Sequence, residues 1–175
     1  MPDHLICRLR LAPLALVLLL LPAFLCASPA AAREPEFVTY THELTCLATA
    51  IYFEARGEPV AGQFAVAQVV LNRVRSDRYP SSVCGVVYQN ADRRNRCQFS
   101  FACDGKPDIP RNATAWDRSR SIANQCLHHP PQIWVLGDAT LYHARYVKPR
   151  WAPRATLVAG IGRHLFYEED TGKAT

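Results

Sequence analysis

Residues 60–74 are apolar on nearly every side of a helix, and this stretch constrains the fold more than any other part of the sequence. Phe64, Ala67, Leu71 and Val74 recur at helical steps, and most of the residues between them are valine or alanine. A helix that is apolar all round is stable only when other elements surround it. We therefore expect residues 60–74 to form a central helix on which the rest of the domain packs.

The preceding residues predict an amphipathic helix with a carboxylate on its apolar side. The helix is expected to begin after Thr41, and its apolar residues recur at helical spacing: Leu44, Leu47, Ile51 and Ala55. Glu54 falls on the same stripe, and burial there would favour its protonated form, which can donate a proton near neutral pH. The alternative is that Glu54 turns to solvent or pairs with Arg56 or Arg75. Glu58 is interpreted as an exposed charge.

The first 32 residues have the pattern of a secretory signal peptide. Two arginines precede an apolar run over residues 11–26, and three alanines end the segment at Ala32. The run is short for a membrane span and is interrupted by two prolines, so a retained anchor is the less favoured alternative. We predict a signal peptide at residues 1–32, a loose arm at 33–40 and one domain at 41–175. The mature protein is expected to be secreted or periplasmic, without a stable membrane span.

The charge indicates which partners the protein can bind, and the cysteine spacing favours disulfides over a metal site. The formal net charge of +5 suits a polyanionic surface such as a cell wall, and export argues against nucleic acid as the partner. Five cysteines lie beyond residue 32, which allows two disulfides and one free thiol in an oxidising compartment. Cys97 and Cys103 bracket a short loop and are the first pair that we expect. Since no C-x-x-C or H-x-x-x-H spacing occurs, no metal or other cofactor is predicted.

The remaining elements predict an α+β domain. We expect a short helix over residues 81–89, an irregular segment over 90–111 and a helix over 112–127. Beyond these the period changes to two, which predicts a hairpin over residues 132–144 and a final strand over 164–167. Helices followed by short strands indicate a mainly helical single domain with a small antiparallel sheet.

Six blocks of sequence occur in a fixed order along the chain. They are A-I-Y-F-E-A-R-G-E-P at 50–59, G-Q at 62–63 with V-V-L-N-R-V at 69–74, C-Q-F-S-F at 97–101 with C-D-G at 103–105, A-T-L-Y-H-A at 139–144, P-R-W-A at 149–152 and I-G-R-H-L-F-Y at 161–167. In this order the sequence resembles the SleB-like cell wall hydrolases, the spore cortex-lytic enzymes and their relatives in non-sporulating bacteria. The resemblance covers nearly all of the mature chain.

The resemblance implies a lysozyme-related fold that acts on the glycan strands of peptidoglycan. The family's catalytic glutamate is the first of the E-A-R-G-E motif, here Glu54, which the apolar stripe singles out independently. Family members studied as cortex enzymes are lytic transglycosylases, which cleave the bond between N-acetylmuramic acid and N-acetylglucosamine without water. Glu54 would first protonate the glycosidic oxygen and then accept the proton of the muramic acid 6-hydroxyl as a 1,6-anhydro ring closes.

Five further residues are expected to contact the substrate. Gln98 and Ser100 would bind sugar N-acetyl groups, and Trp151 would present its ring to a sugar. Tyr142 and His143 would position the substrate or hold the Glu54 carboxyl group. The alternative for Tyr142, His143 and Trp151 is a purely structural role.

Three other functions stay open at this point. A hydrolytic muramidase needs a second carboxylate, for which the sequence offers Glu58, Asp77, Asp92, Asp104 and Asp108. A cysteine amidase or peptidase acting on wall peptides would use Cys84 or Cys97 as nucleophile and His143 as base. A non-catalytic wall-binding protein would tolerate Glu54→Gln without any loss. The extra cysteines and the lack of a repeat domain in this sequence favour a periplasmic wall-remodelling enzyme over a cortex enzyme.

Overall fold

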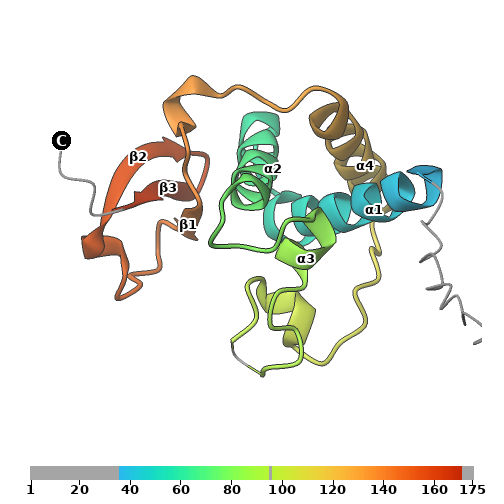
Figure 1. Cartoon of the computed structure of the whole chain (residues 1–175), viewed down its shortest axis with the longest axis horizontal. Coiled ribbons are helices and arrows are strands. Elements are labelled where there is room, and N and C mark those ends of the chain that lie inside the picture. The colour runs from blue at the N-terminus through green and yellow to red at the C-terminus, as the bar shows by residue number, and fades with distance from the viewer. Residues whose placement is uncertain (1–35, 95, 171–175) are drawn as a thin grey trace, which may run out of the picture. The chain divides into compact units, whose positions relative to one another are not determined.

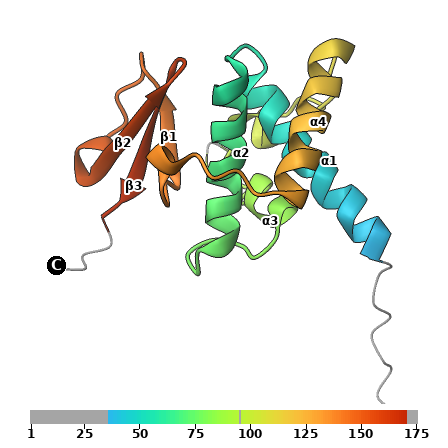
Figure 2. The same cartoon turned by 90° about the horizontal axis from the view of Figure 1, so that it is seen from above.

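Helix α2 (Val60–Arg75) occupies the central position that its apolar sequence predicts. A computed structural model of the chain describes residues 36–94 and 96–170, and all of them belong to one compact unit. Helix α2 contacts α1 (Glu36–Ala55), α3 (Val83–Val87), α4 (Ala113–His128) and the strand β2 (Ala155–Ile161). Figure 2 shows the three strands on one side of α2 and the other three α-helices on the opposite side.

Helix α1 begins at Glu36, so the predicted arm is wrong for the residues up to Tyr40. Thr41 does not cap the helix: its hydroxyl donates to the Phe37 carbonyl one turn earlier, at 2.9 Å. Tyr40 is tied to α4, because its hydroxyl donates to Asn124 Oδ1 at 2.8 Å and lies 2.9 Å from His128 Nε2. These contacts extend the helix beyond the stretch that has apolar periodicity. Residues 33–35 and the predicted signal peptide lie outside the described residues.

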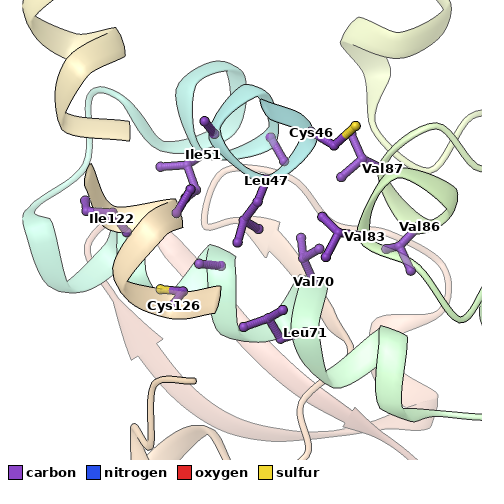
Figure 3. Close-up of a cluster of buried hydrophobic side chains, with 14 of the residues drawn as sticks. Cys46, Leu47, Ile51, Val70, Leu71, Val83, Val86, Val87, Ile122 and Cys126 are labelled. Carbon is purple, nitrogen blue, oxygen red and sulfur yellow. The ribbon is translucent and has the colours of Figure 1, made fainter. Parts of the chain in front are cut away.

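The main core lies where the four helices meet, as Figure 1 and the close-up in Figure 3 show. Aliphatic side chains from each helix are almost fully buried in it: Leu47 and Ile51 from α1, Val70 from α2, Val83 and Val86 from α3, and Ile122 from α4. Burying one such side chain contributes roughly 2 kcal/mol to the free energy of unfolding. The Sγ atoms of Cys46 and Cys84 lie 2.05 Å apart, at disulfide distance, and join α1 to α3. This core fixes the C-terminal end of α1, where Glu54 lies.

The segment between α3 and α4 is irregular, as predicted. Helix α3 is capped by Ser82, and Ser100–Cys103 form a short 3-10 helix, η1. The Sγ atoms of Cys97 and Cys103 are at disulfide distance, in the predicted pairing. Asn112 caps α4 through its side-chain oxygen, which accepts from the Ala115 N–H group at 2.9 Å.

The sheet differs from the predicted hairpin. Its order is β1-β3-β2, in which β3 (His164–Glu169) pairs antiparallel with both β1 (Leu141–Ala144) and β2. The prediction missed β2 because Gly160 and Gly162 resemble chain breaks. Gly162 instead adopts a φ of 57° in the β2–β3 turn, a left-handed conformation that favours glycine.

Residues 132–138 do not form the first strand of a hairpin because α2 binds their backbone. The Gln68 side chain accepts from the Ile133 N–H group at 2.9 Å, and Trp134–Leu136 form a 3-10 helix, η2. Asn72 donates its amide to the carbonyl oxygens of Gly137 and Ala139, at 3.1 and 2.9 Å. The buried polar groups of the central helix thereby position the start of the sheet.

Candidate active site

Glu54 lies in the last turn of α1 and lines a cleft of about 550 Å³. The cleft is formed by the end of α1, by α2, by the segment at residues 98–100, and by β1 with the residues that follow it. Its other lining residues are aromatic, polar or small: Phe53, Arg73, Gln98, Phe99, Ser100, Tyr142, His143, Ala144, Tyr146, Val147 and His164. Glu54 is therefore the only carboxylate among the described residues that line this cleft.

The Glu54 carboxyl group is half-buried and accepts one hydrogen bond from the described part of the chain. Burial raises its pKa above the ordinary value, whereas the Tyr142 hydroxyl, which donates to Oε2 at 3.1 Å, and the positive charge of Arg73 lower it. The net direction is upward, so a proton is held to higher pH than in a free glutamate. Neither predicted alternative occurs: Arg56 lies over the Tyr52 ring at 4.8 Å, and Arg75 bonds to Asn72.

Arg73 is a buried cation at the base of the cleft. Only 2% of its surface is exposed, and its Nε donates to the Thr140 carbonyl at 2.7 Å. The guanidinium lies over the Phe99 ring, 5.3 Å from its centroid. With its side-chain amide turned so that the oxygen faces Arg73, Gln98 accepts two hydrogen bonds at 3.1 and 3.2 Å. The sequence analysis missed Arg73, although a charged residue on a helix that must be buried is the same signal that identified Glu54.

His143 also lines the cleft, but both of its ring nitrogens are engaged. Nδ1 lies 2.8 Å from the Ala144 carbonyl oxygen, which can only accept, so Nδ1 carries the proton. Nε2, at 2.9 Å from the Tyr167 hydroxyl, is then the acceptor. The imidazole is held in one orientation and has no free nitrogen to act as a base.

Trp151 does not reach the cleft. Its indole ring stands edge-on to His143, with centroids 5.6 Å apart, and edge-on to Tyr167 at 5.3 Å. It lines a separate cavity with Tyr79 and Glu169. The structure thus brings Glu54, Gln98, Ser100, Tyr142 and His143 together and places Trp151 behind His143.

Besides Arg73, the sequence analysis missed two further residues of the cleft, Tyr146 and His164. Tyr146 follows β1 and is 86% exposed, and its position at the cleft makes its ring accessible to a sugar. His164, at the start of β3, is only 7% exposed, and its buried Nδ1 has no hydrogen-bond partner among the described residues. Burial lowers the pKa of His164, while the negative charge of Glu58 raises it in part. A tyrosine in a polar turn was a usable signal for Tyr146, whereas nothing local marks His164.

The other carboxylates that the sequence offered are placed elsewhere. Glu58 is buried, contrary to prediction, and forms a salt bridge with Arg163 in which Oε1 lies 2.7 Å from Nε. Asp77 and Asp92 are exposed, and neither lines the cleft. Asp104 and Asp108 line a neighbouring cavity.

The cysteines do not provide a nucleophile among the described residues. Cys84 and Cys97, the two candidates, have their Sγ atoms at disulfide distance from Cys46 and Cys103. The free thiol of Cys126 is buried, and burial raises its pKa to about 12. A thiolate at neutral pH is therefore not available, and the cysteine peptidase hypothesis loses its support.

A half-buried glutamate at a helix end, facing a small antiparallel sheet across a cleft, defines a lysozyme-like class of fold. The family model for "Cell Wall Hydrolase" matches residues 57–167, which is more than half of the chain. This protein belongs to the cell wall hydrolase family. None of the helices in the described part of the chain is both long enough and apolar enough to cross a membrane.

Curated relatives support this assignment. The chain is similar to the spore cortex-lytic enzyme of Bacillus subtilis (strain 168), with 31% identity over 153 residues, 81% of this chain and 45% of the relative. It is 48% identical over 130 residues to that of Oceanobacillus iheyensis, covering 71% of this chain and 41% of the relative. The chain thus spans less than half the length of these relatives. The family match covers residues 57–167 and so begins three residues after Glu54. The alignment with the Bacillus subtilis relative covers 81% of this chain, and a stretch of that length includes Glu54 whatever its first residue.

Two solved structures have the same fold. The catalytic domain of Bacillus cereus SleB matches with a TM-score of 0.54 and 31% identity, covering 73% of this chain and 91% of that one. The catalytic domain of the germination-specific lytic transglycosylase SleB of Bacillus anthracis matches with a TM-score of 0.54 and 29% identity. In that comparison 81% of this chain and all of the other are covered.

Proposed function

We propose that this protein is a lytic transglycosylase that cleaves peptidoglycan glycan strands between N-acetylmuramic acid and N-acetylglucosamine. One observation carries the proposal: Glu54 has a raised pKa in a cleft whose described lining holds no second carboxylate. A carboxyl group that stays protonated to higher pH suits general acid catalysis. The likeness to the solved lytic transglycosylase domain gives independent support.

In the first step Glu54 protonates the glycosidic oxygen. The bond from muramic acid C1 to that oxygen breaks, and its electron pair goes to the oxygen of the departing N-acetylglucosamine. Tyr142 occupies Oε2, which leaves Oε1 to carry the transferred proton. The carboxylate that results is stabilised by the Tyr142 hydroxyl and by the charge of Arg73.

In the second step the same carboxylate acts as a base. It accepts the proton of the muramic acid 6-hydroxyl while that oxygen bonds to C1 and closes the 1,6-anhydro ring. Glu54 returns to its protonated state, and no water is consumed. One carboxyl group therefore suffices, whereas hydrolytic glycosidases use two at separations of about 5 to 9.5 Å.

Gln98, Ser100 and Tyr146 are proposed to contact the sugars. Gln98 is oriented by Arg73, and Ser100 is exposed at the start of η1. Tyr146, rather than Trp151, would stack its exposed ring on a sugar. Tyr142 and His143 would hold the site in place, Tyr142 through Glu54 and His143 through Tyr167.

The proposed site of action is outside the cytoplasm. Residues 1–32 would direct export and be removed. In an oxidising compartment the cysteine pairs 46–84 and 97–103 would form disulfides that fix α3 and the segment before η1.

The test is to incubate the mature protein with purified peptidoglycan and identify the new sugar ends by mass spectrometry. We expect products that end in 1,6-anhydro-muramic acid, and a rate about 10³-fold lower for Glu54→Gln, in the range that general acid catalysis contributes. Glu36→Gln, the same change at an exposed position of the same helix, is the matched control and should retain the wild-type rate.

The alternatives give different results in this experiment. Reducing muramic acid ends would indicate hydrolysis and contradict the lytic mechanism. Undiminished release by Glu54→Gln would contradict the role of Glu54. No release by any variant would favour a wall-binding protein.

A further inference from the structure

A second cavity adjoins the Glu54 cleft, and Phe53 lines both. It has a volume of about 350 Å³ and lies between the C-terminal end of α1 and the segment at residues 104–111. The Phe53 ring is stacked on Phe101, with centroids 4.9 Å apart, and together they form the apolar wall. A group attached to a sugar in the cleft would therefore have this cavity beside it.

The cavity is built from ordered contacts between its two sides. The Tyr52 hydroxyl accepts hydrogen bonds from the backbone N–H groups of Arg111 and Asn112, both at 3.0 Å. The Arg56 guanidinium lies over the same Tyr52 ring, 4.8 Å from its centroid. The buried tyrosine thus fixes the 104–112 segment against α1 and holds two cations at the cavity.

Both signs of charge line this space. Arg56, Lys106 and Arg111 supply three cations, and Asp104 and Asp108 supply two carboxylates. Within the described chain neither aspartate forms a salt bridge with these cations. Burial raises the pKa of Asp108, the negative charge of Asp104 raises it further, and a hydrogen bond from Tyr88 lowers it in part. Two carboxylates that line one cavity attract a cation, so this cavity offers binding partners for an ammonium group.

We propose that this cavity binds the peptide stem of peptidoglycan. The stem is a short peptide joined by an amide bond to the lactyl group of N-acetylmuramic acid, with free carboxylates and a dibasic residue that carries an ammonium group. Lys106 and Arg111 would bind its carboxylates, and Asp104 with Asp108 would bind the ammonium. The inference rests on the proposed function, because the stem reaches this cavity only when its muramic acid lies beside Glu54.

The first experiment measures binding without catalysis. The Glu54→Gln variant is titrated with a free stem tripeptide, alanyl-glutamyl-diaminopimelate, and followed by NMR. We expect saturable shifts of the backbone amides at residues 104–111. The double variant Lys106→Ala/Arg111→Ala should weaken binding about tenfold, since each exposed charge pair contributes up to about 1 kcal/mol. Arg118→Ala/Arg120→Ala removes the same charge from exposed positions on α4 and should have no effect.

The second experiment compares cleavage of intact strands with cleavage of strands stripped of their stems by an amidase. The ratio of the two rates should favour intact strands in the wild type and fall in the Lys106/Arg111 variant, but not in the Arg118/Arg120 variant. Absence of shifts at residues 104–111 up to about 10 mM tripeptide would overturn the subsite, whatever the glycan result. Tripeptide binding without cleavage of either substrate would instead contradict the proposed function and leave the subsite in place.

Discussion

Two glutamates four residues apart differ in burial and in the direction of their pKa shifts: Glu54 lies in the last turn of α1, and Glu58 lies in the turn between α1 and α2. Glu58 is the more buried of the two. Burial alone would raise its pKa, but hydrogen bonds from the backbone and guanidinium of Arg163 outweigh burial and hold the pKa below its ordinary value. Glu54 has only a neutral hydroxyl donor and a more distant arginine, and its pKa is raised. Burial raises the pKa of both carboxyl groups, and the charged partner of Glu58 reverses the direction there.

The paired glutamate has a structural task. Glu58 accepts from Arg163 N at 2.8 Å and from Arg163 Nε at 2.7 Å, which ties the β2–β3 turn to the start of α2. A Cβ atom at Gly162 would collide with the Glu58 carboxylate, so the turn approaches closely only because that residue is glycine. Strand β3 in turn pairs with β1, which carries Tyr142 to Glu54. One glutamate therefore positions the sheet on which the other depends.

Among substitutions that alter the surroundings of the two glutamates, Arg163→Ala is expected to have the largest effect, a loss of stability. The change leaves the Glu58 carboxylate buried without its charged donor, and we expect a loss of about 2 kcal/mol in the free energy of unfolding. Urea unfolding at pH 7 measures it, with Arg120→Ala on exposed α4 as control.

The pH dependence of this loss tests its cause. Because the folded-state pKa of Glu58 is lowered, its contribution is present above the ordinary pKa of 4.5 and is lost as the pH falls through the folded-state value. The gap between wild type and Arg163→Ala should therefore close in acid. An equal gap at pH 3 and pH 7 would mean that the ion pair is not its origin.

A smaller effect is expected from Tyr142→Phe, which removes the one hydrogen bond that the Glu54 carboxyl group accepts from the described residues. We expect the rate of anhydro-product release to fall about tenfold, because the carboxylate formed in the first step loses a donor. The same hydrogen bond lowers the pKa of Glu54, so its loss raises that pKa. The alkaline limb of the pH–rate profile should therefore shift to higher pH. An alkaline limb at the same pH in both proteins would mean that Tyr142 does not affect the pKa of Glu54.

Local periodicity predicted the helical part of the molecule. The apolar pattern of α2 required a central helix, α4 begins within one residue of the predicted position, and the apolar stripe of α1 placed Glu54 beside the core. Each of these features depends on residues within a few turns of one another. Local sequence patterns are therefore sufficient to predict these features.

The sheet and the roles of its side chains depend on contacts across long separations. Glu58 and Arg163 are 105 residues apart, and Gln68 binds the backbone of Ile133 across 65 residues. Such pairs determine that Glu58 is buried and that residues 132–138 are not a strand, but they leave no periodic signal. Trp151 shows the same limit, because its place behind His143 depends on ring contacts with His143 and Tyr167, which belong to two different strands.

The smallest expected effect is a gain in stability when the reactive glutamate is neutralised. Because the pKa of Glu54 is raised in the folded state, ionising it destabilises the fold as the pH rises through that value. Glu54→Gln should therefore raise the melting temperature at pH 7 by about 3 °C, which about 1 kcal/mol produces in a domain of this size. At pH 4, where the carboxyl group is protonated in both states, the two proteins should melt together. Glu58→Gln, the same change four residues away, should lower the melting temperature at pH 7. If both substitutions had the same sign, the two carboxylates would not differ in the way that their partners indicate.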